Sequence, residues 1–225
     1  MISPTQEQAF WDLLCALDES GILPYVMVVG SWAEYLYTYY YGEDYTPNIR
    51  TLDVDILYRN INLPKQRTDF YEVMRTKGFV YVEDPVSGIG KFVKDAVLEI
   101  EILTRSLGRG DAHITIPAIG LKTTSFRSQS LLNQYPLPIE ANELVVIAPE
   151  PSAYLLHKLY INHSRDAVKQ EKDRDGIRLL LAHMRSNAEE YARLTQVFDE
   201  QPDRIKRQIS KNVQRAFISD ELFAR

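Results

Sequence analysis

The chain has 225 residues, of which 45% are hydrophobic and 25% charged, and its formal net charge is −5 at pH 7. These fractions are typical of globular proteins and exclude an intrinsically disordered, collagen-like or low-complexity chain. No apolar run approaches the roughly 18–20 residues of a membrane-spanning helix, and no basic segment followed by an apolar one marks a secretory signal. Because the single cysteine, Cys15, cannot form an internal disulfide, we expect a cytoplasmic protein without membrane association.

The first two thirds of the sequence predict helices that alternate with short strands. Apolar residues at helical spacing indicate a helix from a cap at Ser3 or Thr5 to Gly21, and further helices at Trp32–Tyr41 and Gln66–Lys77. Apolar or alternating runs predict strands at Tyr25–Val29, Leu52–Tyr58, Phe79–Val82, Val97–Leu103 and Leu144–Ile147. Residues 104–143, which contain several glycines and prolines, predict short strands and loops.

The pattern changes to helix beyond Pro151 and continues in amphipathic stretches to Phe217. We therefore expect two domains: residues 1–148 form an α/β domain, and residues 149–225 form a helical domain. Charge differs between the two ends of the chain, because residues 1–57 hold nine acids and one base while residues 158–225 hold eleven acids and fourteen bases. The acidic part could collect metal ions and the basic part could meet polyanions, although two solvated faces are the alternative.

The segment Val28-Val29-Gly30-Ser31 is the first candidate for a functional element. It predicts a strand that leads through a Gly-Ser pair into a helix. Glycine allows the backbone to approach a ligand closely, and the free amides at a helix N-terminus favour phosphate. Taken alone, the segment is equally typical of a plain turn between a strand and a helix.

Acidic residues alternate with apolar ones in two of the predicted strands. Asp53 and Asp55 project to the same face of the first, while Leu52, Val54 and Ile56 face the core. Two adjacent carboxylates repel each other unless a cation or a proton compensates, so the pair predicts a divalent metal site. A polar outer face on an edge strand is the alternative.

A second acidic strand, Leu98–Leu103, can bring a third carboxylate beside the first two, from Glu99 or Glu101. A set of hard oxygen ligands without His or Cys suits Mg²⁺ or Mn²⁺ rather than zinc. Two such ions about 3.5–4 Å apart can activate an attacking oxygen and stabilise a leaving pyrophosphate.

In order and spacing, these residues resemble the nucleotidyltransferase superfamily with the DNA-polymerase-β-like fold. Its pattern is Gly-Gly or Gly-Ser at a helix start, Asp-x-Asp on the next strand and a third acid on a later strand, matched here by Gly30-Ser31, Asp53-Val54-Asp55 and Glu101. The Arg-x-Thr-x-Asp-x-Asp form of bacterial abortive-infection and toxin-type members is similar to this segment, where it is shifted to Arg50-Thr51-Leu52-Asp53. A looser similarity covers Lys158, Arg165 and Lys172-Asp173-Arg174-Asp175, which resemble elements of the helical half of those members.

The resemblance implies an α+β fold, in which a mixed β-sheet with flanking helices is followed by a C-terminal helical bundle. It implies a Mg²⁺- or Mn²⁺-dependent enzyme that moves a nucleoside monophosphate from an NTP to an acceptor hydroxyl and releases pyrophosphate. The expected catalytic residues and metal ligands are Asp53, Asp55 and Glu101, and the expected nucleotide-binding residues are Gly30, Ser31, Arg50 and Lys158. Glu101 is favoured over Glu99 because Ile102-Leu103 after it mirrors the apolar pair after Asp55.

Two departures from the pattern are a glutamate where the third acid is often aspartate, and a lengthened, Tyr-rich connection from Tyr35 to Tyr45. Candidate acceptors are RNA (tRNA-like), a protein or a small molecule, and candidate roles are a toxin–antitoxin component, with an antitoxin partner, or a phage-defence component. The alternative is a catalytically silent protein of the same fold that acts as an RNA- or protein-binding module.

Two stripes of side chains lie outside this motif set. Tyr37, Tyr40, Tyr41 and Tyr45 could stack on a nucleobase, or they could pack in the core. Arg204, Arg207, Lys211 and Arg215 recur at helical spacing beside the apolar residues Ile205, Ile209, Val213 and Phe217. This basic stripe would suit RNA phosphates, and a solvated face is the alternative.

Overall fold

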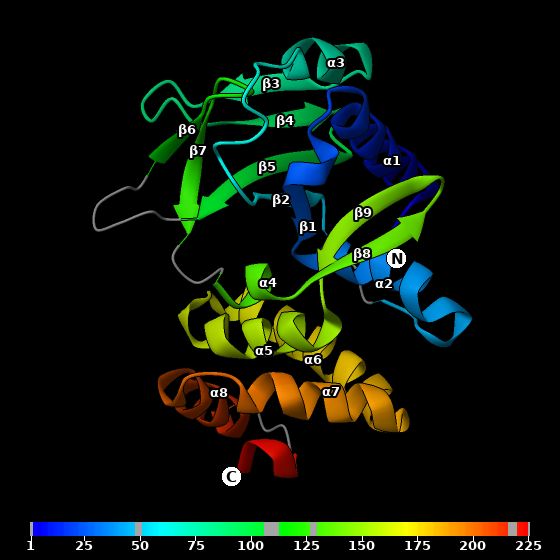
Figure 1. Ribbon diagram of the computed structural model, residues 1–225, viewed down its shortest axis with the longest axis vertical. Coiled ribbons are helices and arrows are strands. Elements are labelled where there is room, and N and C mark those ends of the chain that lie inside the picture. Colours follow the sequence, from blue (N-terminus) through cyan, green and yellow to red (C-terminus); the bar gives the residue numbers. More distant parts are fainter. Residues whose placement is uncertain (1, 48–50, 106–112, 127–129, 216–219, 225) are drawn as a thin grey trace. The chain divides into compact units, whose positions relative to one another are not determined.

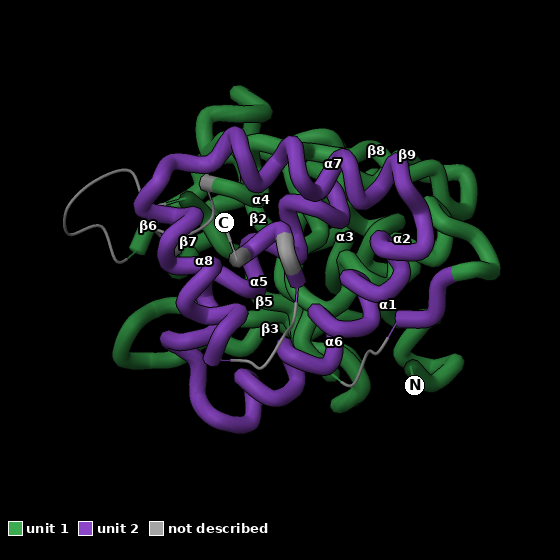
Figure 2. The backbone as a smooth tube through the Cα atoms, turned by 90° about the horizontal axis from the view of Figure 1, so that it is seen from below, with its two compact units in different colours: residues 1–44, 49–149 green, residues 45–48, 150–225 purple. Residues whose placement is uncertain are grey.

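The computed structural model describes residues 2–47, 51–105, 113–126, 130–215 and 220–224 (Figure 1). Its chain divides into two compact units, one of residues 1–44 and 49–149 and the other of residues 45–48 and 150–225 (Figure 2). Residues 45–48 thus lie with the helical unit, although the sequence division assigned them to the α/β part. Each unit is described by itself below.

Unit 1 is built on a mixed sheet (Figure 1). Its strands are β1 (Val26–Val29), β2 (Asp53–Tyr58), β3 (Val80–Glu83), β4 (Gly90–Lys94), β5 (Leu98–Arg105), β6 (His113–Ile116) and β7 (Leu121–Phe126). The order is β1-β2-β5-β4-β3, and β7 also pairs with β5 and with β6. β2 and β7 run parallel to β5, whereas β1 is antiparallel to β2 and β4 is antiparallel to β5. The predicted α+β class with a mixed sheet is therefore confirmed.

Helices cover the apolar face of this sheet. They are α1 (Pro4–Glu19), α2 (Ser31–Tyr41) and α3 (Phe70–Thr76). Ser3 caps α1 in a capping box with Gln6, in which the side-chain oxygen of each residue accepts a hydrogen bond from the backbone amide of the other. Phe10 of α1 stacks on Trp32 of α2 with ring centroids 4.4 Å apart, and both rings are fully buried. This aromatic contact joins the first two helices in the core.

The opposite face of β1 and β2 is covered by later parts of the chain. These are the short helix α4 (Ser130–Gln134) and a separate hairpin of β8 (Pro136–Ala141) and β9 (Leu144–Pro149). Leu132 of α4 is buried with Met27, Val29 and Leu57, and Ile147 of β9 packs against the same cluster. The apolar residues of β1 thus contact protein on both faces of the sheet.

Two elements differ from the sequence predictions. The helix expected over Gln66–Lys77 begins only at Phe70, because the amide of Thr68 donates to the carbonyl of Ala118 instead of continuing a helix. Strand β4 was not predicted, since two apolar residues stand together in the run Lys91-Phe92-Val93-Lys94 and break the alternation of polar and apolar positions.

Unit 2 consists of helices. They are α5 (Pro151–Ile161), α6 (Ala167–Ser186), α7 (Ala188–Asp199) and α8 (Asp203–Arg215), with short 3₁₀ turns at Asn162–Ser164 and Glu221–Ala224. α5 lies against α6, α7 and α8, and most of its residues are buried. The helical character predicted beyond Pro151 is confirmed. In the parts of the chain that the structure describes, every helix is too short or too polar to cross a membrane.

Candidate active site

Four carboxylates face the same side of the two central strands of unit 1. The parallel register of β2 and β5 pairs Asp53 with Glu99 and Asp55 with Glu101. Residues between them, such as Val54 and Ile100, are fully buried on the other face. The alternation seen in the sequence therefore places an apolar row against the helices and an acidic row against solvent.

Gly30 lies directly beside this acidic row. The β1–β2 register pairs Val29 with Asp55, so the chain leaves β1 next to the Asp55 side chain. Gly30 has φ 67° and ψ −157°, a conformation that is essentially restricted to glycine. A Cβ built on Gly30 would overlap Oδ2 of Asp55 and lie 3.3 Å from its Cγ. Close approach to Asp55 and unusual backbone geometry thus both require glycine here.

Ser31 is the first residue of α2, whose N-cap is Gly30. Because the N-cap residue is a glycine, it has no side chain that could cap this end of the helix. The first amides of a helix have no partner within it, and they favour an anionic group. The Gly-Ser pair predicted to receive phosphate is therefore presented beside Asp55, at the same edge of the acidic row.

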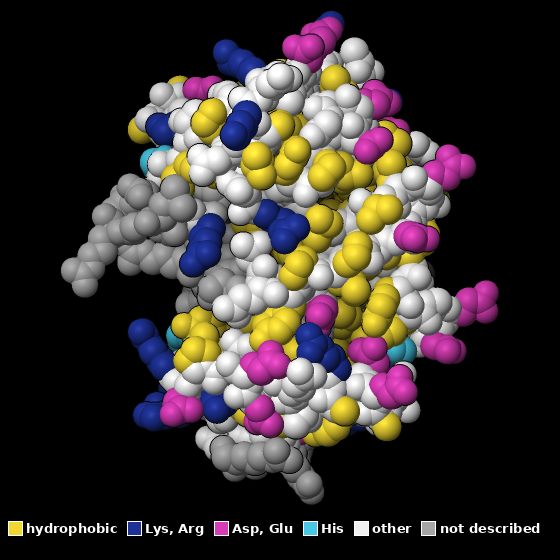
Figure 3. All heavy atoms as spheres, viewed as in Figure 1, with side chains coloured by type: hydrophobic (Ala, Val, Ile, Leu, Met, Phe, Trp, Pro, Cys, Tyr) yellow, Lys and Arg dark blue, Asp and Glu magenta, His cyan; other side chains and the backbone are white. Residues whose placement is uncertain are grey.

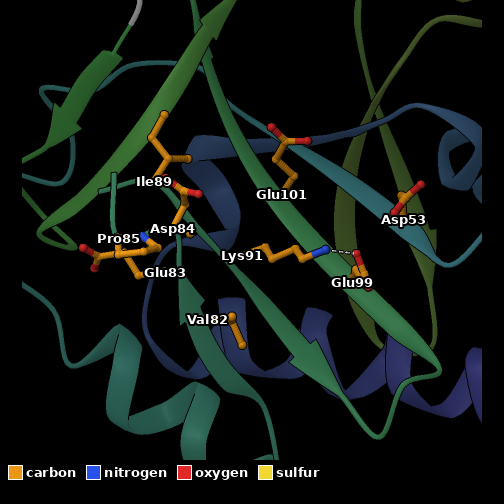
Figure 4. Close-up of a pocket in the computed structure, with 10 residues that line it drawn as sticks. Asp53, Val82, Glu83, Asp84, Pro85, Ile89, Lys91, Glu99 and Glu101 are labelled. Carbon is orange, nitrogen blue, oxygen red and sulfur yellow. Dashed lines mark hydrogen bonds and ion pairs between the residues drawn. The ribbon is translucent and has the colours of Figure 1, made fainter. Parts of the chain in front are cut away.

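A cavity of about 540 Å³ opens over the carboxylates (Figure 4). Its acidic side is formed by Asp53, Glu99 and Glu101, from β2 and β5. The opposite side is the β3–β4 hairpin, which contributes Val82, Glu83, Asp84, Pro85, Ile89, Gly90 and Lys91. Three of the four sheet carboxylates thus line one side of the cavity, and the hairpin on the other side contributes several apolar side chains.

Lys91 is a residue of this site that sequence reasoning missed. Its ammonium group forms an ion pair with Glu99 across β4 and β5, drawn as a dashed line in Figure 4. The pair neutralises one of the two candidate third acids. Lys91 stands in a strand that the sequence analysis did not predict. Neither strand β4 nor the pair of Lys91 with Glu99 could therefore be inferred from the sequence.

Asp84 has a structural part in the wall of the cavity. It accepts hydrogen bonds from the amides of Val86 and Ser87 and from the Ser87 hydroxyl. The hydrogen bonds from the Ser87 amide and hydroxyl are the main causes that lower the pKa of Asp84. The charged form therefore favours the folded turn at neutral pH, and this contribution is lost as the pH falls through the lowered pKa.

The residues fit a hard divalent cation in their chemistry and in their placement on the sheet. Asp53, Asp55 and Glu101 offer carboxylate oxygens from adjacent strands, without His or Cys. In the described part of the chain, no three His, Cys, Asp or Glu side chains are gathered closely enough to hold an ion. These three carboxylates therefore share one face of the sheet without converging on a common point.

The structure gives different outcomes for the remaining predicted residues. Arg50 lies outside the described residues. Lys158 belongs to α5 of unit 2, where its Nζ lies 2.8 Å from Oδ1 of Asp173. Arg165 forms a second ion pair with the same carboxylate at 3.0 Å. Asp173 therefore pairs with both cations, whereas Asp175 pairs with Arg178 near the surface.

The tyrosine stripe splits between the two units. Tyr37 is fully buried and its hydroxyl donates to the carbonyl of Pro149 at 2.8 Å, so it packs in the core of unit 1. Tyr40 is exposed, and its ring lies 4.8 Å from that of Tyr41. Tyr45 is buried in unit 2 with its ring beside His183. Packing therefore accounts for Tyr37 and Tyr45.

We expect Asp173→Asn to destabilise unit 2 by about 3–5 kcal/mol, because breaking a buried ion pair leaves an uncompensated buried charge. The side chain of Asp173 is 2% exposed, and its loss would leave Lys158 and Arg165 facing each other. Urea unfolding followed by circular dichroism measures the change. Asp175→Asn is the matched control, because its pair with Arg178 is solvent-exposed and should contribute less than about 1 kcal/mol. Equal losses in the two variants would contradict this interpretation.

Comparison with known proteins identifies the family of the chain. A family model described as nucleotidyltransferase matches residues 8–197, which is most of the chain. The chain therefore belongs to this nucleotidyltransferase family, and it is an enzyme that transfers a nucleoside monophosphate. The predicted superfamily is confirmed.

Solved structures with a similar course of the chain include two nucleotidyltransferase-type proteins. The antibiotic-resistance factor ANT(2'')-Ia, determined in solution, has 13% sequence identity and a TM-score of 0.43 over 87% of this chain and 91% of its own. An antigenic nucleotidyltransferase-like protein from Paracoccidioides brasiliensis has 15% identity and a TM-score of 0.44 over 89% of this chain and 91% of its own. No curated protein matches the sequence.

Proposed function

We propose that this nucleotidyltransferase requires a divalent cation, Mg²⁺ or Mn²⁺, and that Asp53, Asp55 and Glu101 hold it. The observation that carries the proposal is the register of β2 and β5, which sets these carboxylates on one face of the sheet. Asp55 lies beside Gly30, and Asp53 and Glu101 line the cavity. Such a cation supplies positive charge for the attacking oxygen and for the leaving pyrophosphate.

The chain's own residues have separate roles in this proposal. The Gly30 and Ser31 amides at the start of α2 hold triphosphate oxygens, as free helix N-terminal amides favour phosphate. Glu101 accepts the proton of the acceptor hydroxyl, whose oxygen then bonds to the α-phosphorus while the bond from that phosphorus to the pyrophosphate oxygen breaks. Positioning and charge neutralisation provide most of the acceleration in such a reaction.

Lys158 and Arg50 stay predicted nucleotide ligands. In the structure, the ammonium group of Lys158 is held by the buried pair with Asp173. The pair itself explains why a lysine stands on this largely buried helix.

The choice between the two candidate third acids leads to a direct prediction. Glu101→Gln should lower the rate of nucleotidyl transfer by about 10²–10³-fold, a range measured when one group that stabilises transition-state charge is removed. Glu99→Gln is the matched control, since Glu99 is paired with Lys91, and it should change the rate by less than about tenfold. Initial rates of pyrophosphate release measure both. A larger loss for Glu99→Gln would reverse the assignment.

The metal requirement can be tested without turnover. Mg²⁺ added with a non-hydrolysable NTP analogue should raise the melting temperature of the wild-type protein, because a ligand that binds only the folded state stabilises it. The shift should disappear in the Asp53→Asn, Asp55→Asn double variant. A shift of equal size in the wild-type protein and this variant would place the cation elsewhere.

The biological role proposed from the Arg50–Asp55 motif is that of a toxin–antitoxin or phage-defence component. Its support is the resemblance of that motif to toxin-type members of the superfamily. Expression of the wild-type chain should then arrest growth, and expression of the Asp53→Asn, Asp55→Asn variant should not. Normal growth at equal expression of both would remove this role and leave the enzymatic proposal intact.

A further inference from the structure

Helix α8 of unit 2 has one face fixed in the core. Ile209 and Val213 are buried, and Asn212 donates to the carbonyls of Leu159 and Tyr160 of α5 at 2.7 and 3.1 Å. The rotation of α8 about its axis is therefore set by apolar packing together with buried hydrogen bonds. The side of α8 opposite Ile209 and Val213 therefore faces solvent.

That other side carries a row of four exposed cations, which we call the α8 basic face: Arg204, Arg207, Lys211 and Arg215. At 1.5 Å per residue, the row extends along the helix for about 16 Å. Figure 3 shows Lys and Arg side chains projecting at the lower left of unit 2, where Figure 1 places α8. Asp203 is the single acid of the helix, and it pairs with Lys206 outside the row.

The α8 basic face differs from an ordinary solvated surface of this protein. On α6, three exposed or half-buried cations are matched by acids one turn away, in the pairs Lys169–Asp166, Arg174–Glu171 and Arg178–Asp175. Within the described ranges of the chain, the four cations of the α8 basic face form no ion pair. Their charge is therefore available to an external anion.

The character of the face favours a polyanion over a protein partner. The centre of a protein–protein interface is depleted in charge and anchored by apolar or aromatic side chains. The fully exposed residues of α8 include no apolar side chain. A row of one sign of charge, spaced by three or four residues, complements instead a chain of phosphates.

We propose that the α8 basic face binds the phosphate backbone of single-stranded RNA, and that RNA is the acceptor of the transferred nucleotide. The second part rests on the proposed function, which needs a hydroxyl acceptor. RNA carries both the chain of phosphates that the face complements and a terminal ribose whose hydroxyl can accept the nucleotide. The face holds the RNA through charge, without reading its sequence.

The salt dependence of binding tests the number of contacts. Four phosphate contacts on a single strand give a slope of about −2.8 in log K against log salt, so the affinity should fall roughly fiftyfold between about 50 and 200 mM salt. Fluorescence anisotropy with an end-labelled, unstructured RNA of about 30 nucleotides measures this. Replacing Arg207 and Lys211 by Gln should halve the slope, so that the same salt change costs only about sevenfold.

A charge-matched control is available on α6. Lys169→Gln with Arg178→Gln also removes two exposed positive charges from unit 2, but both of these residues are paired with acids. The control should retain the wild-type slope and affinity, and thermal melting checks that both double variants are folded. Equal loss of affinity in the two variants would contradict the assignment to α8.

The RNA proposal and the catalytic proposal fail in different ways. The Asp53→Asn, Asp55→Asn variant should bind RNA as the wild type does and transfer no nucleotide. The Arg207→Gln, Lys211→Gln variant should label RNA at least about fivefold less at low RNA concentration and recover at saturating RNA. If the wild type binds RNA but does not label it, RNA is not the acceptor. If the Arg207→Gln, Lys211→Gln variant labels RNA as well as the wild type does, the α8 basic face is not the binding surface.

Discussion

Replacing Asp53 and Asp55 together by Asn should abolish nucleotidyl transfer, with a loss of at least about 10³-fold. The two side chains stand on one face of β2, where a cation shared with Glu101 would bind. Removal of a single group that stabilises transition-state charge already costs roughly 10²–10³-fold, and here two such groups are lost. The measurement is transfer of label from each of four α-³²P-labelled NTPs to components of a cell lysate.

A suitable control removes two negative charges elsewhere in unit 1. Asp18→Asn with Glu140→Gln changes two exposed carboxylates that do not line the cavity, so labelling should continue at the wild-type rate. Labelling that survives in the Asp53→Asn, Asp55→Asn protein would refute the metal site. Asn keeps the shape of Asp, and these positions are exposed or half-buried, so we expect both proteins to fold.

Replacing Gly30 by alanine should reduce activity by about a hundredfold or more. The added Cβ would overlap the Asp55 carboxylate, so either β1 or Asp55 must move. A misplacement of about 1 Å in an active site can cost on the order of 10² in rate. Steady-state measurement of pyrophosphate release, at several Mg²⁺ concentrations, gives the loss and shows whether cation affinity falls with it.

Gly42 allows backbone strain to be separated from the clash at Asp55. It ends α2 with φ 72° and ψ −151°, almost the same conformation as Gly30, but a Cβ added there meets no atom within 4 Å. In both variants the strained backbone should cost about 1–3 kcal/mol of stability, but Gly42→Ala should keep its activity. If both variants lose activity equally, strain in α2 rather than displacement of Asp55 is responsible.

The acidic strands could be predicted because their signal is local. Asp53, Asp55, Glu99 and Glu101 each alternate with apolar residues, and this alternation sets the face of a strand regardless of its neighbours. The Gly30-Ser31 pair also precedes Asp53 and Asp55 along the chain, as in the pattern of the superfamily. The acids of Leu98–Leu103 indicated only that this strand can bring a third carboxylate beside the first two, because a local pattern does not specify which strands are neighbours.

Other parts of the site depend on contacts between distant residues. Lys91 joins the site only through the register of β4 against β5, and its pairing with Glu99 separates that acid from Glu101. The hydrogen bond from the amide of Thr68 to the carbonyl of Ala118 shortens α3, although residues 66–69 have ordinary helical propensity. The buried pair of Lys158 and Asp173 joins α5 to α6, and a lysine among apolar residues was compatible with both a buried and a solvent-facing ammonium group.

The position of the β3–β4 hairpin has a consequence for how this enzyme can change. The carboxylates stand on β2 and β5 inside the sheet, whereas β3 is its outermost strand on that side. Asp84, Pro85 and Ile89, which lie between β3 and β4, line the cavity without pairing with the acidic strands. Insertions or substitutions in this turn can therefore remodel the ligand-facing wall while the reaction chemistry is inherited unchanged. Substrate choice and catalysis can evolve here as separate modules.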